Sequence, residues 1–344
     1  MKIVDLRSDT VTKPTLEMRQ AMYQAEVGDD VYGEDPTVQK LEELGAGIMG
    51  KESALFVASG TMGNQIALMA HTNKGDEVIC EAESHIFYYE VAGIACLAGA
   101  QARPIAGQRG ILSSDIIKHH IRPQDVHQPR TTLICLENTH NRAGGTCYSV
   151  QDLAQIKDLA DSYKIPVHID GARIFNAAVA QNVSVEKLAE KANSITFCLS
   201  KGLCAPVGSL LTGSHDFIQK CRRYRKMLGG GMRQAGILAA AGIVGIETMV
   251  GRLQYDHLHA KMLAEALVTI GMDIDIKTVQ TNIVIANVSP LGITANQAAA
   301  LLGGQGIKVA VFGEYSIRFV THHGIEKEDI SHTASAIARI FKGI

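Results

Sequence analysis

The sequence has no tryptophan, few aromatic residues and no long hydrophobic run. Aromatic residues account for only 5% of its 344 positions. The longest apolar stretch, Ile237–Ile246, is too short to span a bilayer, and the N-terminal residues lack the apolar core of a signal peptide. These absences argue against a membrane partner, and we expect a cytoplasmic protein.

Paired cysteines and an excess of either charge are also missing. The seven cysteines are an odd number and include no Cys-x-x-Cys pair, which indicates free thiols in a reducing compartment. The formal net charge is -2, so nothing favours a nucleic-acid partner. The 13 histidines show no spacing typical of a metal site, and we predict no metal.

What the sequence does contain is an alternation of strand and helix patterns. Short buried strands separate helices that we expect over about 15–25, 62–71, 85–95 and 150–162. Such alternation is typical of a mainly parallel α/β sheet. The length predicts about two domains, and the pattern changes near residue 251. We expect a large α/β domain with an N-terminal arm over 1–250 and a small α+β domain over 251–344.

Several chemically active side chains share one place in this pattern, directly after a predicted strand. They are Ser59, His85, Glu137, Asp170 and Lys201. The carboxyl ends of parallel strands meet at one edge of a sheet, where ligands of such folds gather. The sequence therefore predicts that these residues form one site.

Lys201 lies between Ser200 and Gly202 at the end of an apolar strand. A partly buried lysine can lose its proton, and the neutral amine can bond covalently to a carbonyl substrate or to pyridoxal phosphate (PLP). A lysine in an exposed turn after a strand would give the same pattern. This stretch alone does not separate the two interpretations.

Two other motifs also allow two interpretations. A strand followed by Ser59, Gly60 and Thr61 and then a helix offers free N–H groups to a phosphate, but an ordinary N-capped helix has the same residues. Asp170 could cap a helix, or it could face a pyridine nitrogen and keep it protonated. Arg173 could bind a carboxylate or a phenolate oxygen, or form a surface ion pair.

Six segments together resemble the low-specificity L-threonine aldolases, which are fold-type-I PLP enzymes. The segments are Asp5–Pro14, Gly28–Val38, Ser59–Asn64, His168–Asn176, Cys198–Ser209 and Met227–Gly236. The resemblance implies a PLP-dependent, aspartate aminotransferase-like α/β fold with a mainly parallel seven-stranded sheet. It also implies that the chain binds PLP and cleaves a small amino-acid substrate, L-threonine or L-allo-threonine, to glycine and acetaldehyde.

The same resemblance implies which residues bind the cofactor. Lys201 carries the PLP, Asp170 faces the pyridine nitrogen and His85 stacks on the ring. The phosphate is held by the turn and by a neighbouring subunit, through Ser59, Gly60, Thr61, Ser200 and Arg233. A residue supplied by a neighbour implies a homo-oligomer, which we expect to be a homotetramer, although the sequence alone does not separate dimer from tetramer.

The resemblance also implies how the substrate is held. Its carboxylate is bound by Ser8, Arg173 and Arg318, and the proton of its hydroxyl goes to His127, to His85 or to a water held by them. Other residues expected to line the pocket are Tyr32, Tyr89 and Glu90. The sequence does not choose among the bases.

Two other reactions fit the same lysine and aspartate: an aminotransferase reaction and a folate-dependent hydroxymethyl transfer. The Asp5–Pro14 arm and the Met227–Gly236 loop favour the aldolase. The alternative to an enzyme is a non-catalytic protein that binds PLP or another anion. It would keep the cofactor but turn over no substrate.

Overall fold

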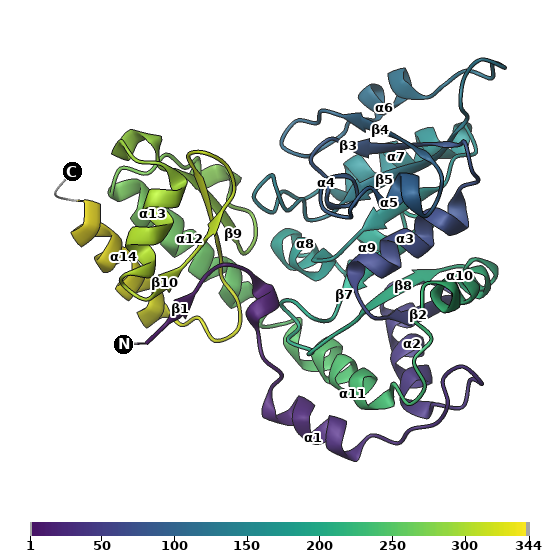
Figure 1. Ribbon diagram of the computed structural model, residues 1–344, viewed down its shortest axis with the longest axis horizontal. Coiled ribbons are helices and arrows are strands. Elements are labelled where there is room, and N and C mark those ends of the chain that lie inside the picture. The colour runs from purple at the N-terminus through teal and green to yellow at the C-terminus, as the bar shows by residue number, and fades with distance from the viewer. Residues whose placement is uncertain (1, 342–344) are drawn as a thin grey trace.

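The computed structural model describes residues 2–341 (Figure 1). Its large α/β unit is built on a seven-stranded sheet with the order β2-β8-β7-β6-β5-β3-β4. Only β8 runs antiparallel to its neighbours. The strands are β2 Ser53–Val57, β3 Glu77–Glu81, β4 Gln101–Ile105, β5 Thr131–Glu137, β6 Val167–Asp170, β7 Ser194–Cys198 and β8 Ser209–Gly213. The predicted, mainly parallel seven-stranded sheet is confirmed.

Both faces of this sheet are buried, because its strands alternate apolar side chains between two helical layers. Leu55 and Val57 of β2 join the core under one layer, whereas Ala54 and Phe56 join the core under the other. The first layer contains α3 Gly60–His71, α4 His85–Tyr88, α5 Gly93–Cys96 and α10 His215–Met227. The second contains α1 Leu16–Gln24, α2 Pro36–Ile48, α6 Ser114–His120, α7 Val150–Ser162, α8 Ile174–Gln181, α9 Val185–Ala189 and α11 Gly236–Val244.

The prediction of one continuous helix over 85–95 is wrong. The structure has the two short helices α4 and α5 instead. Val91 and Ala92 separate them with φ angles of 53° and 55°, in the left-handed region that an α-helix cannot include. Hydrophobic spacing alone does not show this break, because both short helices bury apolar residues.

A small α+β unit begins with the long helix α12. It holds a three-stranded antiparallel sheet with the order β11-β12-β9. Its elements are α12 Leu253–Thr269, β9 Ile283–Asn287, α13 Ala295–Gly303, β10 Ile307–Lys308, β11 Ala310–Val311, β12 Ser316–Val320 and α14 Lys327–Phe341. The unit thus combines helices with a small sheet, while the domain boundary near residue 251 stays a prediction.

The N-terminal segment connects the two units. Strand β1, Val4–Asp5, pairs in parallel with β10, and Val4 and Leu6 are part of the core of the small unit. The chain then crosses to the large unit through a short 3-10 helix at Asp9–Val11 (Figure 1). The predicted N-terminal arm therefore starts as a strand of the small unit, although it precedes the large one in sequence.

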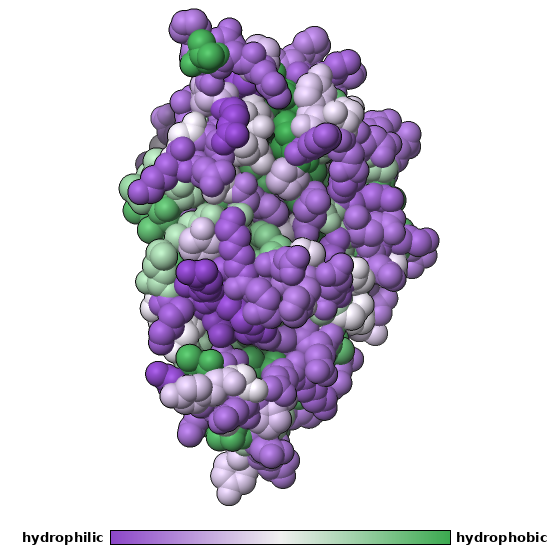
Figure 2. All heavy atoms as spheres, turned by 90° about the vertical axis from the view of Figure 1, so that its right-hand side faces the viewer, coloured by the Kyte–Doolittle hydropathy of each residue, from purple (hydrophilic) through white to green (hydrophobic). Residues whose placement is uncertain are grey.

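The outer surface is mainly hydrophilic on the face shown in Figure 2, with apolar residues gathered in small groups. Within residues 2–341, no single helix is both long and apolar enough to cross a membrane. Only the bent pair Gly236–Met249 and Leu253–Thr269, which turns by 68° at its break, reaches that length together.

Candidate active site

A cavity of about 200 Å³ lies at the carboxyl ends of the parallel strands. It brings together all five residues that follow predicted strands. Its lining is Ser59, Gly60, Thr61, Asn64, His85, Glu137, Thr139, Asn141, Asp170, Ala172, Arg173, Cys198, Ser200 and Lys201. A larger cavity of about 660 Å³ beside α8 and α9 contains none of the predicted site residues.

A second cavity of about 250 Å³ shares four of these residues and reaches the small unit. Its lining is Ser8, Thr10, His85, Tyr89, Asn141, Arg173, Lys201, Phe312 and Arg318. The N-terminal arm thus reaches this cavity through Ser8 and Thr10. The shared wall makes the two cavities one continuous pocket between the large sheet and the small unit.

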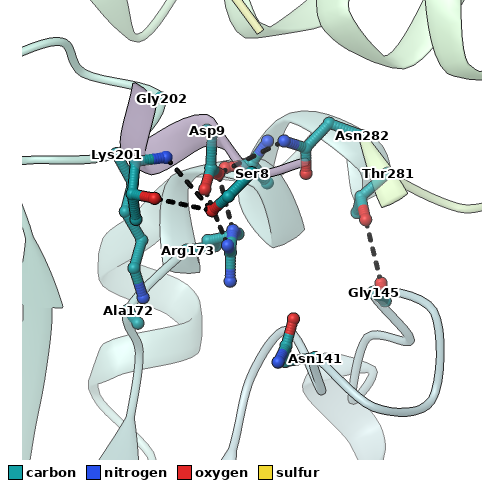
Figure 3. A network of polar contacts seen from close by, with 12 residues as sticks. Ser8, Asp9, Asn141, Gly145, Ala172, Arg173, Lys201, Gly202, Thr281 and Asn282 are labelled. Carbon is teal, nitrogen blue, oxygen red and sulfur yellow. Dashed lines mark hydrogen bonds and ion pairs between the residues drawn. The ribbon is translucent and has the colours of Figure 1, made fainter. Parts of the chain in front are cut away.

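Lys201 lies in the turn after β7 and is half-buried, so it is not a lysine of an exposed turn. The Thr12 hydroxyl of the N-terminal arm donates to its backbone carbonyl at 2.9 Å. Figure 3 shows the Lys201 side chain extending past the Asp9–Arg173 pair toward Ala172. Its amine therefore enters the pocket from the edge where both cavities meet.

The turn from Ser59 to Thr61 caps a helix and also lines the cavity, so its role as an N-cap does not exclude the predicted phosphate site. The Ser59 hydroxyl accepts from the Met62 N–H at 3.1 Å and caps α3. A Cβ at Gly60 would lie 2.9 Å from Cys198 Sγ, so only glycine lets the chain pass this close. The positive end of α3 and the Ser200 residue face the same cavity.

Asp170 is buried at the end of β6, and both of its oxygens accept hydrogen bonds. Asn64 Nδ2 donates to Oδ2 at 2.8 Å, and the Ala172 N–H donates to Oδ1 at 3.0 Å. The next helix, α8, has Arg173 at its N-cap position, so Asp170 does not cap it.

His85 is oriented by Glu90, whose carboxylate is only 3% exposed. His85 Nδ1 lies 2.9 Å from Glu90 Oε1, which leaves Nε2 for the cavity. Burial alone would lower the pKa of His85. The hydrogen bond that His85 donates to Glu90 and the charges of Asp170 and Glu137 outweigh burial and raise that pKa above its usual value. His85 is the histidine of this pocket that can hold a proton.

Arg173 is paired with Asp9, a residue that the sequence interpretation missed. Arg173 Nε and Nη2 donate to the two oxygens of Asp9 at 2.6 and 2.7 Å, and both side chains are buried. The pair is visible in Figure 3, where Asn282 also donates to Asp9 at 3.3 Å. Burial alone would raise the pKa of Asp9, but the Arg173 charge lowers it well below its usual range. The surface ion pair considered for Arg173 is therefore excluded.

Arg318 of β12 approaches the same cavity from the small unit. Nη1 donates to Asn141 Oδ1 at 2.6 Å and Nη2 donates to the Arg7 carbonyl at 2.9 Å. Within residues 2–341 its Nε is buried without a hydrogen-bond partner. Burial, together with the nearby charge of Arg173, lowers the pKa of Arg318 to about 10. Two guanidinium groups beside one cavity have the charge and the donors that an anion requires.

Four predicted residues do not line the pocket of their own chain: Arg233, His127, Tyr32 and Glu90, of which Glu90 is buried against His85. Arg233 is exposed, pairs with Asp29 at 2.9 Å and lies over the Tyr32 ring at 6.0 Å. His127 is on an exposed loop and contacts Asp125 at 2.9 Å. His127 and Tyr32 therefore do not line the pocket of their own chain, and the position of His127 near the substrate hydroxyl stays a prediction.

The structure adds residues that sequence analysis did not single out as functional. Asp9 and Asn64 lie inside two of the motifs that carry the resemblance, so their motifs were the available signal. The others are Thr10, Thr139, Asn141 and Phe312, which line the cavities. Nothing in the local sequence marks Phe312, which comes from a loop of the small unit.

Comparisons with known proteins agree with this geometry. The chain matches the beta-eliminating lyase family over residues 5–290. It is 45% identical over 341 residues to low-specificity L-threonine aldolase 1 of Arabidopsis thaliana, covering 97% of this chain and 95% of that protein. It is 42% identical over 337 residues to the low specificity L-threonine aldolase of Escherichia coli strain K12, covering 97% and 98%.

A solved structure gives the same result for the fold. The threonine aldolase of Leishmania major superposes with a TM-score of 0.83 at 18% identity, over 98% of this chain and 99% of that chain. At this identity the likeness establishes the shared architecture. The expected fold-type-I arrangement of a large α/β unit and a small unit is thereby confirmed.

Proposed function

The chain belongs to the beta-eliminating lyase family and, within it, to the low-specificity L-threonine aldolases; from this we propose that its pocket cleaves β-hydroxy-α-amino acids by a PLP-dependent retro-aldol reaction. The substrates are L-threonine and L-allo-threonine, and the products are glycine and acetaldehyde. The enzyme is a carbon–carbon lyase.

The residues of the pocket fit PLP. A carboxylate at one end, Asp170, matches a protonated ring nitrogen, and the N-terminus of α3 at the Ser59–Thr61 turn matches a phosphate. Lys201 lies on the same cavity. The hydroxyl of Thr139 is buried without a partner within residues 2–341 and lines this cavity, so it can donate to a bound group. We assign the phosphate to Ser59, Gly60, Thr61 and Ser200, and the covalent bond to Lys201.

The substrate carboxylate is the second anion that the pocket accepts. Arg173 and Arg318 lie on the cavity beside Ser8, and the unpartnered Nε of Arg318 is available to an entering carboxylate. Two guanidinium groups fix the orientation of an amino acid, so that the Cα–Cβ bond takes one direction relative to the cofactor. Bound PLP supplies an electron sink for the electrons of that bond.

His85 is the base in this proposal. Its Nε2 faces the cavity, and Glu90 holds its Nδ1, so the imidazole can take the β-hydroxyl proton. As the proton moves to Nε2, the Cα–Cβ bond breaks and the carbonyl of acetaldehyde forms. His85 also contacts the ring in this assignment, and Tyr89 lies beside it with the ring centroids 5.5 Å apart.

The main support for the proposal is that the two cavities are lined in part by the same residues. His85, Arg173 and Lys201 line both of them. One group of residues thus meets a covalently held cofactor, a carboxylate and a hydroxyl at once. An aminotransferase has no need of a base at the β-hydroxyl, whereas a retro-aldol reaction requires one.

We further propose that the complete site is formed by two subunits of a cytoplasmic homotetramer. Arg233 and Tyr32 are exposed and lie together outside the pocket of their own chain, where they can reach the phosphate and pocket of a partner. Mixing Arg233→Ala with Lys201→Ala subunits, each inactive alone, is expected to restore up to about a quarter of wild-type activity. Absence of rescue after proven subunit exchange would contradict the shared site.

The function is tested by acetaldehyde release from L-threonine and L-allo-threonine, measured in parallel with a coupled reductase. Release with equal glycine is expected from the PLP-loaded protein. Lys201→Ala removes it, whereas Lys51→Ala, which changes a part-buried lysine far from the pocket, keeps it. A PLP-loaded wild type that releases no aldehyde from either isomer would refute the aldolase reaction.

A further inference from the structure

Asn64 of α3 shares its amide between two carboxylates. Its Nδ2 donates to Asp170 Oδ2 at 2.8 Å and to Glu90 Oε1 at 2.8 Å. Asn64 is 1% exposed, so water does not compete for these bonds. A primary amide has two N–H bonds, and both are used here. One neutral side chain therefore holds the carboxylate at the cofactor ring and the carboxylate that orients His85.

The orientation of this amide is fixed from its other end. Asn64 Oδ1 lies 3.2 Å from His168 Nε2, and an amide oxygen only accepts, so Nε2 carries the proton. His168 Nδ1 then accepts from the Ser194 hydroxyl at 2.9 Å, and the Ser194 oxygen accepts from His71 Nε2 at 2.7 Å. Turning the amide round would place Oδ1 against both carboxylates.

The direction of this series of hydrogen bonds does not depend on pH in the neutral range. Burial lowers the pKa of His168 to about 4 and that of His71 to about 3. Both histidines therefore stay neutral, and each keeps one donor and one acceptor nitrogen. The hydrogen bonds run from His71 through Ser194, His168 and Asn64 to Asp170.

We propose that Asn64 is a positioning residue for the reaction, because its one amide sets Asp170 against the cofactor ring and Glu90 against His85. The proposal rests on the proposed function for the roles of Asp170 and His85. What it adds is that a single side chain contacts both Asp170, which faces the electron sink, and Glu90, which orients the base. Loss of either N–H leaves a buried carboxylate oxygen with one donor fewer.

The test replaces the donor without changing the shape. Asn64→Asp puts an oxygen in place of Nδ2, and Asn64→Ser removes both N–H bonds without adding charge. Asn176→Asp is the matched control, since Asn176 is also buried and its Nδ2 contacts only His257, at 3.1 Å. The measurements are the dissociation constant of PLP, kcat and KM for L-allo-threonine, and the thermal midpoint of each holoenzyme.

We expect Asn64→Asp to raise the PLP dissociation constant about tenfold and to lower kcat about 30-fold, with KM within about threefold of wild type. Asn64→Ser is expected to lower kcat about tenfold. The control keeps kcat and PLP affinity within about threefold. If Asn64→Asp does not fold, Asn64→Ser decides the question.

The proposal is overturned if Asn64→Ser keeps both kcat and PLP affinity at the level of the control. It is equally overturned if both Asn64 variants lose activity only in parallel with their thermal midpoint, as a purely structural residue would. A wild type without aldolase activity would refute the proposed function instead. The PLP dissociation constants would then still show whether Asn64 positions Asp170.

Discussion

The two walls of the pocket differ in how completely their charges are paired. The wall that we assign to the cofactor ring contains Asn64 and Asp170, together with Glu90, which is hydrogen-bonded to Asn64, and it has a donor for every carboxylate oxygen. The wall that we assign to the substrate, formed by Ser8, Arg173 and Arg318, holds two guanidinium groups that repel each other, and a buried Nε without a partner in the described chain. We call these the ring wall and the substrate wall.

This difference corresponds to how long each ligand stays. A cofactor that remains through many turnovers meets a wall whose polar groups are already fixed, so little reorganisation is needed. A substrate that enters and leaves in each turnover meets a wall whose charge is incomplete until it binds. Asp9 limits that excess charge by pairing with Arg173, which leaves Arg318 as the less completely paired arginine.

The largest expected effect comes from breaking the ring wall at its centre. Asp170→Asn keeps the shape but removes the charge opposite the ring nitrogen, so the electron sink weakens. We expect kcat to fall about 1,000-fold, which corresponds to about 4 kcal/mol in the activation free energy, while part of the cofactor stays bound. Steady-state kinetics and the visible absorption of the bound cofactor measure the two effects.

The control for this variant is Asp30→Asn, another buried aspartate, whose partner Arg225 lies outside the pocket. That variant is expected to lower stability and leave kcat nearly unchanged. If Asp170→Asn turned over substrate as fast as Asp30→Asn, the ring wall would have no electronic role.

The substrate wall is broken by Arg318→Lys. Lysine keeps the positive charge but loses the planar fork that can contact Asn141, Arg7 and a carboxylate together. We expect KM to rise about 30-fold, or about 2 kcal/mol, with kcat within about threefold. Arg222→Lys, which changes an arginine paired with Glu42 outside the pocket, is expected to change neither constant. A fall in kcat alone would place Arg318 in the chemical step instead of in binding.

Local sequence patterns place single residues of the pocket but not the contacts between them. Asp170 ends a strand, Lys201 and the Ser59–Thr61 turn follow one, and the alternation of strands and helices is enough to place all three at one edge of the sheet. Local patterns report such positions well because strand order and direction decide them.

The substrate wall depends on partners that are distant in sequence. Asp9 and Arg173 are separated by 164 residues, and Arg318 meets Asn141 across 177. Neither the periodicity nor a local motif predicts which arginine pairs with which distant side chain. The exposed position of His127 was missed for the same reason, because the family pattern gives its sequence neighbours and not its direction from the pocket.

The smallest expected effect comes from replacing Glu90, the residue of the ring wall that contacts His85. Glu90→Gln removes a charge and can keep the geometry: the Gln65 amide has a buried oxygen without a partner in residues 2–341, so it can turn and accept from the new amide. The charged groups that remain around His85 are Asp170, Glu137, Lys201, Arg173 and Arg318.

His85 must be neutral to accept a proton, so kcat is expected to rise with pH through the pKa of His85, which lies above its usual value. Removing the Glu90 charge destabilises the protonated imidazole, so in Glu90→Gln the rise moves to lower pH, by about half a unit to one unit. Glu83→Gln, at an exposed glutamate that pairs with Arg142, leaves the profile in place. An unmoved rise in Glu90→Gln would assign the base to another group, whereas a rise at higher pH would contradict the electrostatic account of the ring wall.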